Sequence, residues 1–391
     1  MATQNGQAGF LRLSRACFST TRKEFNLFPR KGEAVDYSVV ADAYAKLESI
    51  SGRNEMTEVL AGLLAAAPKD ELRKLVYLTQ GKLGPDYEGV ELGLAEKMAL
   101  RAISTATGLP SGVVYNAYTK TGDIGTAAEQ LLHRKVQGTL YSETLTLERV
   151  YSTLLRMAGQ SGVGSVEIKL KELVSLLNDA SPREAKFIMR TVTGQLRLGA
   201  ADYTVLDAAA AAFLGSKKER AKVERAYNVH PDLGFVVEVV ALRGLKGLES
   251  AKVEVGVPIR PMLAERLESA KAIVNKMGDK KIVSEYKLDG ERLQIHKSGD
   301  KVALFSRRLE VITSHYPDAV GLVREHVLAK CAILEAEVVA INEETGEYLP
   351  FQELMHRRRK YGIDKAAVEY PVALNFFDLL LAGQTDFTRR P

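Results

Sequence analysis

Three residues close together in the sequence, Glu285, Lys287 and Arg292, carry side chains that could do chemistry. Residues 282–288 alternate in polarity, which predicts a strand that places Glu285 and Lys287 on one face, about 7 Å apart. Asp289-Gly290 supplies a turn signal directly after this run. A carboxylate, an amine and an arginine so close together suit an amine nucleophile that acts on an anionic substrate.

The amine sets a condition on its surroundings. An ordinary lysine amine has a pKa of about 10.4, so at neutral pH nearly all of it is protonated and cannot attack. Lys287 can serve as a nucleophile only in a site that favours the uncharged amine, through desolvation or neighbouring cations such as Arg292 or a bound metal. A bare Lys-x-Asp-Gly match is more simply explained as an exposed hairpin that carries charges.

Length and composition indicate a globular protein of two ordinary domains. The chain has 391 residues, of which 46% are hydrophobic and 26% charged. No apolar run approaches the roughly 18 residues needed to cross a bilayer, so we expect no membrane-spanning segment. Cys17 and Cys331 lie too far apart for a metal-ligand motif, which argues against a zinc site or a disulfide scaffold and fits a reducing intracellular compartment.

The net charge of +5 does not identify a partner, because the excess lies at the amino terminus. Residues 1–35 carry six Lys/Arg against two Asp/Glu, whereas 36–257 balance at 27 against 27 and 258–391 at 21 against 20. The acid-free residues 1–23 are compatible with an organellar transit peptide. They show no convincing amphipathic period. We therefore expect residues 1–35 to form a disordered extension and not a transit peptide.

Residues 36–254 predict a first, all-helical domain. Apolar residues recur at helical spacing over several segments, which are 37–49, 58–66, 72–78, 92–105 and 204–214. The clearest start signal is Ser181-Pro182-Arg183-Glu184, where serine caps, proline fits the first turn and glutamate completes a capping box.

Glycine-containing loops recur between these helices, at 81–84, 120–125 and 194–199. Such loops can expose backbone N–H groups that bind phosphates without contacting bases. Each glycine is also explained if it merely ends a helix. Three such loops in one helical domain favour nucleic-acid binding through the backbone to a modest degree.

Residues 255–391 predict a second domain of α+β type with antiparallel strands. Alternating or β-rich runs predict its strands, at 281–288, 292–297, 302–306, 332–341 and 372–381, with a short helix at 351–355. Gly299-Asp300 between two of these runs is a hairpin signal.

Further candidate site residues lie on these strands. Arg307 ends one strand, Glu335 and Glu337 share a face of another, and Phe377 precedes an acid. Arginines can neutralise phosphates, a carboxylate can hold a divalent metal, and a ring can stack on a base. Each also has a simpler explanation, as a surface ion pair, a solvated strand face or plain core. The basic run 356–360 is most simply a solvated face.

The lysine motif and its followers resemble a known family. Residues 285–292, Glu-Tyr-Lys-Leu-Asp-Gly-Glu-Arg, resemble the adenylated-lysine motif of ATP-dependent DNA ligases, within the covalent nucleotidyltransferase superfamily. Residues 305–308, 334–337 and 377–380 resemble the next motifs in the right order. RNA ligases and capping enzymes share the lysine motif, so they remain alternatives.

The helical half narrows the choice. Residues 77–85, 120–125 and 196–199 look like parts of the DNA-binding domain of archaeal and eukaryotic replicative ligases. The resemblance covers about residues 36–391 and is closer to the archaeal form. It implies nicked double-stranded DNA as partner, a monomer, a cytoplasmic location and a contact with the sliding clamp.

The resemblance also implies residue roles. Lys287 would be the nucleophile that becomes AMP-lysine, and Glu285 would hold the adenine amino group of ATP. Phe377 would pack on the adenine ring, while Arg292 and Arg307 would contact the nucleotide. These residues would serve three steps: attack on ATP, transfer of AMP to the 5′-phosphate of a nick, and strand sealing by the 3′-hydroxyl.

Glu337 would lie by the ribose and a magnesium ion. Each step places negative charge on a phosphoryl group in transfer, so magnesium and arginines should supply most of the stabilisation.

The chain departs from the family at its end. The family continues with a second carboxylate motif, a lysine-rich motif and an oligonucleotide-binding domain, and this sequence stops at Pro391 before them. We therefore expect a truncated chain that binds nicked DNA weakly and adenylates poorly or not at all. A non-catalytic DNA-binding fragment is the alternative from another functional class.

Overall fold

The computed structural model describes the chain as two compact units. The described residues are 34–134, 143–278, 280–358 and 362–390. The first unit consists of residues up to 85, 89–227 and 232–251, and the second of 86–88, 228–231 and 252–391. The expectations for residues 1–33 fall outside the described residues. No described helix combines the length and apolar character needed to cross a bilayer.

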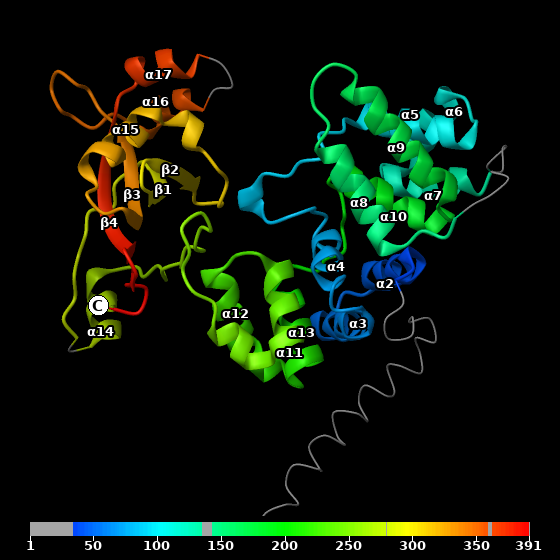
Figure 1. Ribbon diagram of the computed structural model, residues 1–391, viewed down its shortest axis with the longest axis horizontal. Coiled ribbons are helices and arrows are strands. Elements are labelled where there is room, and N and C mark those ends of the chain that lie inside the picture. Colours follow the sequence, from blue (N-terminus) through cyan, green and yellow to red (C-terminus); the bar gives the residue numbers. More distant parts are fainter. Residues whose placement is uncertain (1–33, 135–142, 279, 359–361, 391) are drawn as a thin grey trace, which may run out of the picture. The chain divides into compact units, whose positions relative to one another are not determined.

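The regular elements of the first unit are all helices within its described residues (Figure 1). Its α-helices are α2 (Tyr37–Ser49), α3 (Arg53–Ala66), α4 (Leu72–Thr79), α5 (Glu96–Thr107), α6 (Ser111–Thr121), α7 (Ile124–Leu132), α8 (Leu147–Ala158), α9 (Ser165–Asp179), α10 (Pro182–Val192), α11 (Asp202–Leu214), α12 (Arg220–Val229) and α13 (Leu233–Glu249). The predicted capping box is confirmed, because Ser181 Oγ accepts from the Glu184 N–H and Glu184 Oε2 accepts from the Ser181 N–H. The predicted helix at 92–105 begins only at Glu96, since Ala95 is extended.

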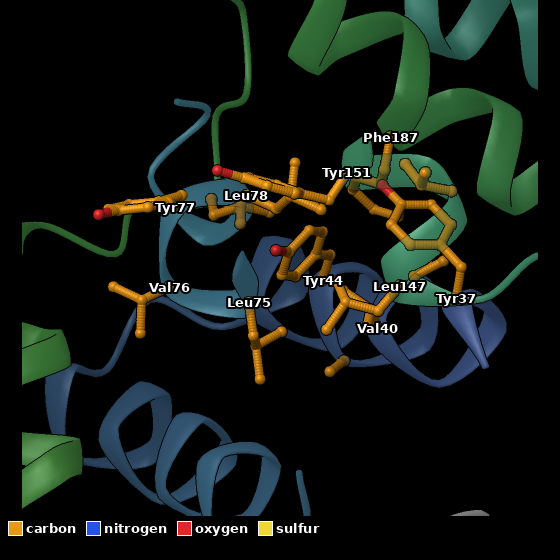
Figure 2. Packing of buried hydrophobic residues seen from close by; sticks show 14 of the residues in the cluster. Tyr37, Val40, Tyr44, Leu75, Val76, Tyr77, Leu78, Leu147, Tyr151 and Phe187 are labelled. Carbon is orange, nitrogen blue, oxygen red and sulfur yellow. The ribbon is translucent and has the colours of Figure 1, made fainter. Parts of the chain in front are cut away.

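Tyrosines form part of the core of this unit (Figure 2). The Tyr44 ring meets Phe187 edge-on, with 5.5 Å between ring centroids. Its hydroxyl lies 3.0 Å from Thr79 Oγ1, so the polar end of the ring is satisfied inside the core. Tyr151 donates to the backbone oxygen of Leu83 at 2.6 Å. The glycine-containing loop at 81–84 is thereby attached to α8.

The second unit contains one antiparallel sheet in the order β2-β1-β3-β4-β5. Its strands are β1 (Glu291–Ser298), β2 (Lys301–Ser306), β3 (Cys331–Ala340), β4 (Val372–Ala382) and β5 (Thr385–Asp386), and its α-helices are α14 (Ala270–Met277), α15 (Pro317–His326), α16 (Phe351–Leu354) and α17 (Ile363–Glu369). The predicted strands at 292–297, 302–306, 332–341 and 372–381 are confirmed, as is the hairpin at Gly299-Asp300. A helical domain is thus followed by an antiparallel α+β domain, as expected.

The predicted strand at 281–288 is wrong. These residues form no ladder, their side chains from Lys281 to Lys287 are exposed, and regular pairing begins at Glu291. Alternating polarity describes two faces of an extended segment, but a strand also needs a neighbour for its backbone groups. Lys287 therefore lies in an irregular segment that leads into β1.

The two faces of the sheet differ in what covers them. Leu293 and Ile295 of β1 point into an apolar core with Ala319 and Val323 of α15. Figure 1 shows α15, α16 and α17 grouped beside the sheet. The alternate residues of β1, beginning with Arg292, point to the opposite face because side chains of a strand alternate. The candidate site lies on that opposite face.

Residues 359 and 360 of the basic run fall outside the described residues, but its described part, 356–358, is not simply a solvated face, because Arg357 is 0% exposed. Its guanidinium forms an ion pair with Asp318 and donates to the backbone oxygens of His315 and Tyr370. It also lies 5.2 Å from the ring centroid of Tyr316. This arginine therefore joins α15 to the segments around it.

Replacing Arg357 with methionine should lower the free energy of unfolding of the second unit by about 3 kcal/mol, because it removes one partner of a buried ion pair and the donor to the carbonyls of His315, Ala367 and Tyr370. Urea unfolding followed by circular dichroism measures the change. Arg324→Met, which removes an exposed arginine from the same region, should cost less than about 0.5 kcal/mol. Equal effects of the two substitutions would contradict this interpretation of Arg357.

Candidate active site

Gly290 brings the lysine segment against β3. A Cβ at this position would lie 2.2 Å from the backbone oxygen of Val338 and 3.0 Å from Glu337 Cγ, so only glycine allows so close an approach. The Gly290 N–H donates to the Glu337 carboxylate, and Lys287 lies near enough to that carboxylate to act on its charge. Lys287, the predicted nucleophile, therefore acts electrostatically on Glu337, the predicted metal ligand, and no ion pair joins the two among the described residues.

Glu337 is half-buried, and the pKa of its carboxyl is raised. Burial raises the pKa of this carboxyl above its ordinary value, and the Gly290 N–H, Lys287 and Arg292 only partly oppose that effect. Its charged form would gain from a further cation. A magnesium ion fits this position, because magnesium is commonly held by one or two carboxylates together with substrate phosphates. No cluster of three or more metal-ligating side chains occurs among the described residues.

Arg292 is fixed on two sides. It forms an ion pair with Glu335, a carboxylate that is 5% exposed, and its guanidinium lies 5.5 Å from the centroid of the Phe377 ring. Charge-assisted hydrogen bonds of this type are strong and directional. The arginine is therefore held in place on the sheet while its neighbour Phe377 remains 42% exposed.

A β-bulge determines where Phe377 lies. Glu335 pairs with Asp378 and Ala336 pairs with Phe376, which leaves Phe377 as the extra residue of β4. Bulges commonly redirect a side chain at a functional site. Here the bulge leaves an aromatic ring close to Arg292 and open to solvent on one side.

Glu285 and Arg307 make no direct contact with this group among the described residues. Both are exposed, and within the described residues no hydrogen bond or ion pair joins either to the other candidate site residues. Arg307 lies on a turn in which Leu309 adopts a left-handed conformation with φ of 67°. Ser306 Oγ accepts from the backbone N–H groups of Arg308 and Glu310, so the turn that carries Arg307 is well defined.

Two neighbours of the site were not selected as site residues from the sequence, Gln294 and His296. Both follow Arg292 at spacings of two along β1 and therefore share its face. Gln294 Nε2 donates to Glu335 at 3.0 Å. Side chains alternate between the two faces of a strand, so once Arg292 was selected, the same alternation could have predicted that Gln294 and His296 lie on its face.

The loop at 120–125 shows both features considered for the glycine-containing loops. Gly122 ends α6 in the left-handed conformation, and Asp123 caps α7 by accepting from the Thr126 N–H at 2.6 Å. Arg190 donates to the same carboxylate at 3.1 Å. The helix-ending role of Gly122 is confirmed, while phosphate binding by this loop stays a prediction.

Comparisons with known proteins match both halves of the chain. The family model described as "DNA ligase N terminus" matches residues 36–210, and the one described as "ATP dependent DNA ligase domain" matches residues 261–391. Among solved structures, mycobacterial DNA ligase D complexed with ATP and MES covers 26% of this chain and 30% of its own, at 24% identity and a TM-score of 0.21. That similarity is too low to carry an argument.

Curated archaeal relatives match most of the chain. A protein named "DNA ligase 2" from Thermofilum pendens is 52% identical over 91% of this chain and 60% of its own length. "DNA ligase" from Cenarchaeum symbiosum is 52% identical over 90% of this chain and 60% of its own length. "DNA ligase" from Saccharolobus solfataricus is 46% identical over 91% of this chain and 61% of its own length. The chain spans about 60% of the length of these relatives. With its helical unit, its antiparallel unit and both family matches, the chain belongs to the ATP-dependent DNA ligases of archaeal type.

Proposed function

We propose that this protein is a DNA ligase that seals nicks in duplex DNA through AMP attached to Lys287. The observation that carries the proposal is the close contact of Gly290 with β3, which brings the lysine segment to the strand of Glu337, where the charge of Lys287 acts on that carboxylate. The cations that would favour the uncharged amine for attack on a phosphate are the fixed guanidinium of Arg292 and a magnesium ion held by Glu337. In the first step the amine nitrogen bonds to the α-phosphorus of ATP, and pyrophosphate leaves.

The other candidate residues are assigned to nucleotide binding. Arg292 and Arg307 would contact the nucleotide, and Phe377 would pack on the adenine ring. Glu285 would accept from the adenine amino group. The fixed guanidinium of Arg292 beside the exposed ring of Phe377 supports two of these assignments, because phosphate and base recognition need a cation and an aromatic surface.

Glu337 would hold magnesium, which when bound neutralises phosphate charge. Its half-buried carboxyl with a raised pKa supports this role. The Gly290 N–H donates to this carboxylate, and the charge of Lys287 acts on it.

Nicked double-stranded DNA is the proposed partner, with the helical unit as its binding domain. AMP would pass from Lys287 to the 5′-phosphate, and the 3′-hydroxyl would then displace AMP and join the strand. We further propose a monomer, a contact with the sliding clamp and a cytoplasmic location, all of which follow from the resemblance to archaeal ligases alone.

Incubation with ATP labelled at the α-phosphate, in the presence of magnesium, tests the proposal. We expect covalent label at Lys287, located by mass spectrometry, and weaker labelling of this chain than of a chimera that joins it to the part of the Cenarchaeum symbiosum relative it does not match. The chimera should also seal nicked DNA. Labelling by GTP would favour a capping enzyme, and a preference for nicked RNA would favour an RNA ligase. DNA binding with no label in either protein would leave a non-catalytic DNA-binding module.

A further inference from the structure

A buried hydrogen-bonded network runs along β1 on the face that carries the candidate site. His296 is 1% exposed and Gln294 is 5% exposed. His296 Nδ1 accepts from the Gly256 N–H at 2.9 Å, and His296 Nε2 lies 3.0 Å from Gln294 Oε1. The same Gln294 oxygen accepts from the Ile259 N–H at 2.6 Å. The network therefore connects the sheet to the segment of residues 252–260, which we call the arm.

The contacts allow only one arrangement of protons and amide atoms. Because the Gly256 N–H must donate to Nδ1, the proton of His296 lies on Nε2 and is donated to Gln294 Oε1. Gln294 Nε2 then donates to the Ile259 carbonyl at 3.2 Å and to Glu335 at 3.0 Å. Burial lowers the pKa of His296 to about 3, which keeps the ring neutral as this arrangement requires.

The network reaches the candidate site through one carboxylate. Glu335 accepts from Gln294 on one oxygen and from Arg292 on the other. A chain of contacts thus extends from the arm through Gln294 and Glu335 to the guanidinium beside Phe377. Val253 of the arm also packs on the sheet residues Ile333 and Leu381.

Stability alone gives little reason for so polar an interior. Buried polar groups contribute less than apolar residues of equal volume unless every partner is present, whereas a fully connected network determines one geometry. Here every polar atom of the Gln294 side chain has a partner, and two of those partners belong to the arm. Such a network fixes the position of the side chain at its end most strongly, and here that side chain is Arg292.

We infer that Gln294, together with Glu335, is a positioning residue that fixes Arg292 for the nucleotide and links it to the path of the arm. This inference rests on the proposed function, because Arg292 is the group assigned to contact the nucleotide. Ordering of the arm and nucleotide binding should then favour each other, since coupling between two sites is reciprocal.

Gln294→Met tests the inference, because methionine has a similar size and shape but cannot form these hydrogen bonds. The probe is α,β-methylene-ATP, which binds like ATP but cannot transfer AMP to lysine. We expect affinity for the probe, measured by calorimetry, to fall about tenfold in Gln294→Met and to fall no further when the same change is made in an Arg292→Ala background. A purely structural role would reduce affinity by the same factor in both backgrounds.

Hydrogen exchange provides a second readout. Exchange at the Gly256 and Ile259 amides should be slowed by the probe in the wild-type chain, and should be faster and insensitive to the probe in Gln294→Met. Lys297→Met, which removes a hydrogen bond from the opposite face of the same strand, should alter neither exchange nor affinity.

The outcomes separate the two proposals. Binding that responds to Arg292→Ala but not to Gln294→Met would overturn the inference alone, as would equal losses in both backgrounds. A wild-type chain that does not bind the probe, or that binds it equally well after Arg292→Ala, would overturn the proposed function and with it the inference.

Discussion

A Lys287→Arg variant is expected to lose covalent AMP attachment and, in the chimera described above, strand joining, by at least about 10⁴-fold. The guanidinium keeps its proton at any accessible pH, so it cannot supply the electron pair that bonds to phosphorus. The positive charge beside Glu337 is retained, which separates loss of the nucleophile from loss of charge. Mass spectrometry after incubation with ATP and magnesium measures the first effect, and a nicked-duplex assay measures the second.

Lys281→Arg is the matched control for this substitution. Lys281 is an exposed lysine of the same irregular segment, six positions before the proposed nucleophile. It should be labelled to the wild-type extent, and binding to nicked DNA should be unchanged in both variants. Label that persists on another lysine after Lys287→Arg would contradict the assignment of the nucleophile, although not the membership of the family.

The lysine motif selected side chains whose charges act on one another, but the backbone that it implied is wrong. Glu337 was expected near a metal and Arg292 near a nucleotide, and both roles stay predictions, while the charges of Lys287 and Arg292 act on Glu337 in the structure. The strand expected at 281–288 is absent because alternation cannot say which segment would pair with it. Phe377 occupies a bulge. A bulge depends on how two strands pair in register, so it could not be predicted from the sequence of β4 alone.

Burial of charged residues was the other feature that sequence reasoning did not find. Arg357 lies within a run of basic residues that indicated a solvated face, and it is buried because Asp318 and two carbonyls come from segments distant in the sequence. The simpler prediction for Glu335 was a position on the solvated face of a strand, yet its side chain is 5% exposed and paired with Arg292. In both cases tertiary partners offset the cost of removing a charge from water.

Gly290→Ala is expected to reduce labelling of Lys287 by about 100-fold or more while the protein remains folded. The added Cβ would lie 2.2 Å from the Val338 oxygen and 2.9 Å from Val339 Cγ2, and a backbone oxygen within a ladder cannot move aside without moving β3. The lysine segment must therefore shift outward, which weakens the N–H donation to Glu337. A displacement of about 1 Å between reacting groups costs on the order of 100-fold in rate.

Gly321→Ala is the control, because Gly321 lies in α15 of the same unit and a Cβ there meets no atom within 4 Å. It should be labelled like the wild type and be slightly more stable, since alanine favours a helix by about 1 kcal/mol over glycine. Overpacking at Gly290 should lower the free energy of unfolding by about 1–3 kcal/mol, which leaves the protein folded. Circular dichroism checks that both variants are folded before their labelling is compared. Wild-type labelling of Gly290→Ala would mean that the contact with β3 does not position Lys287, and the main support for the proposed function would be lost.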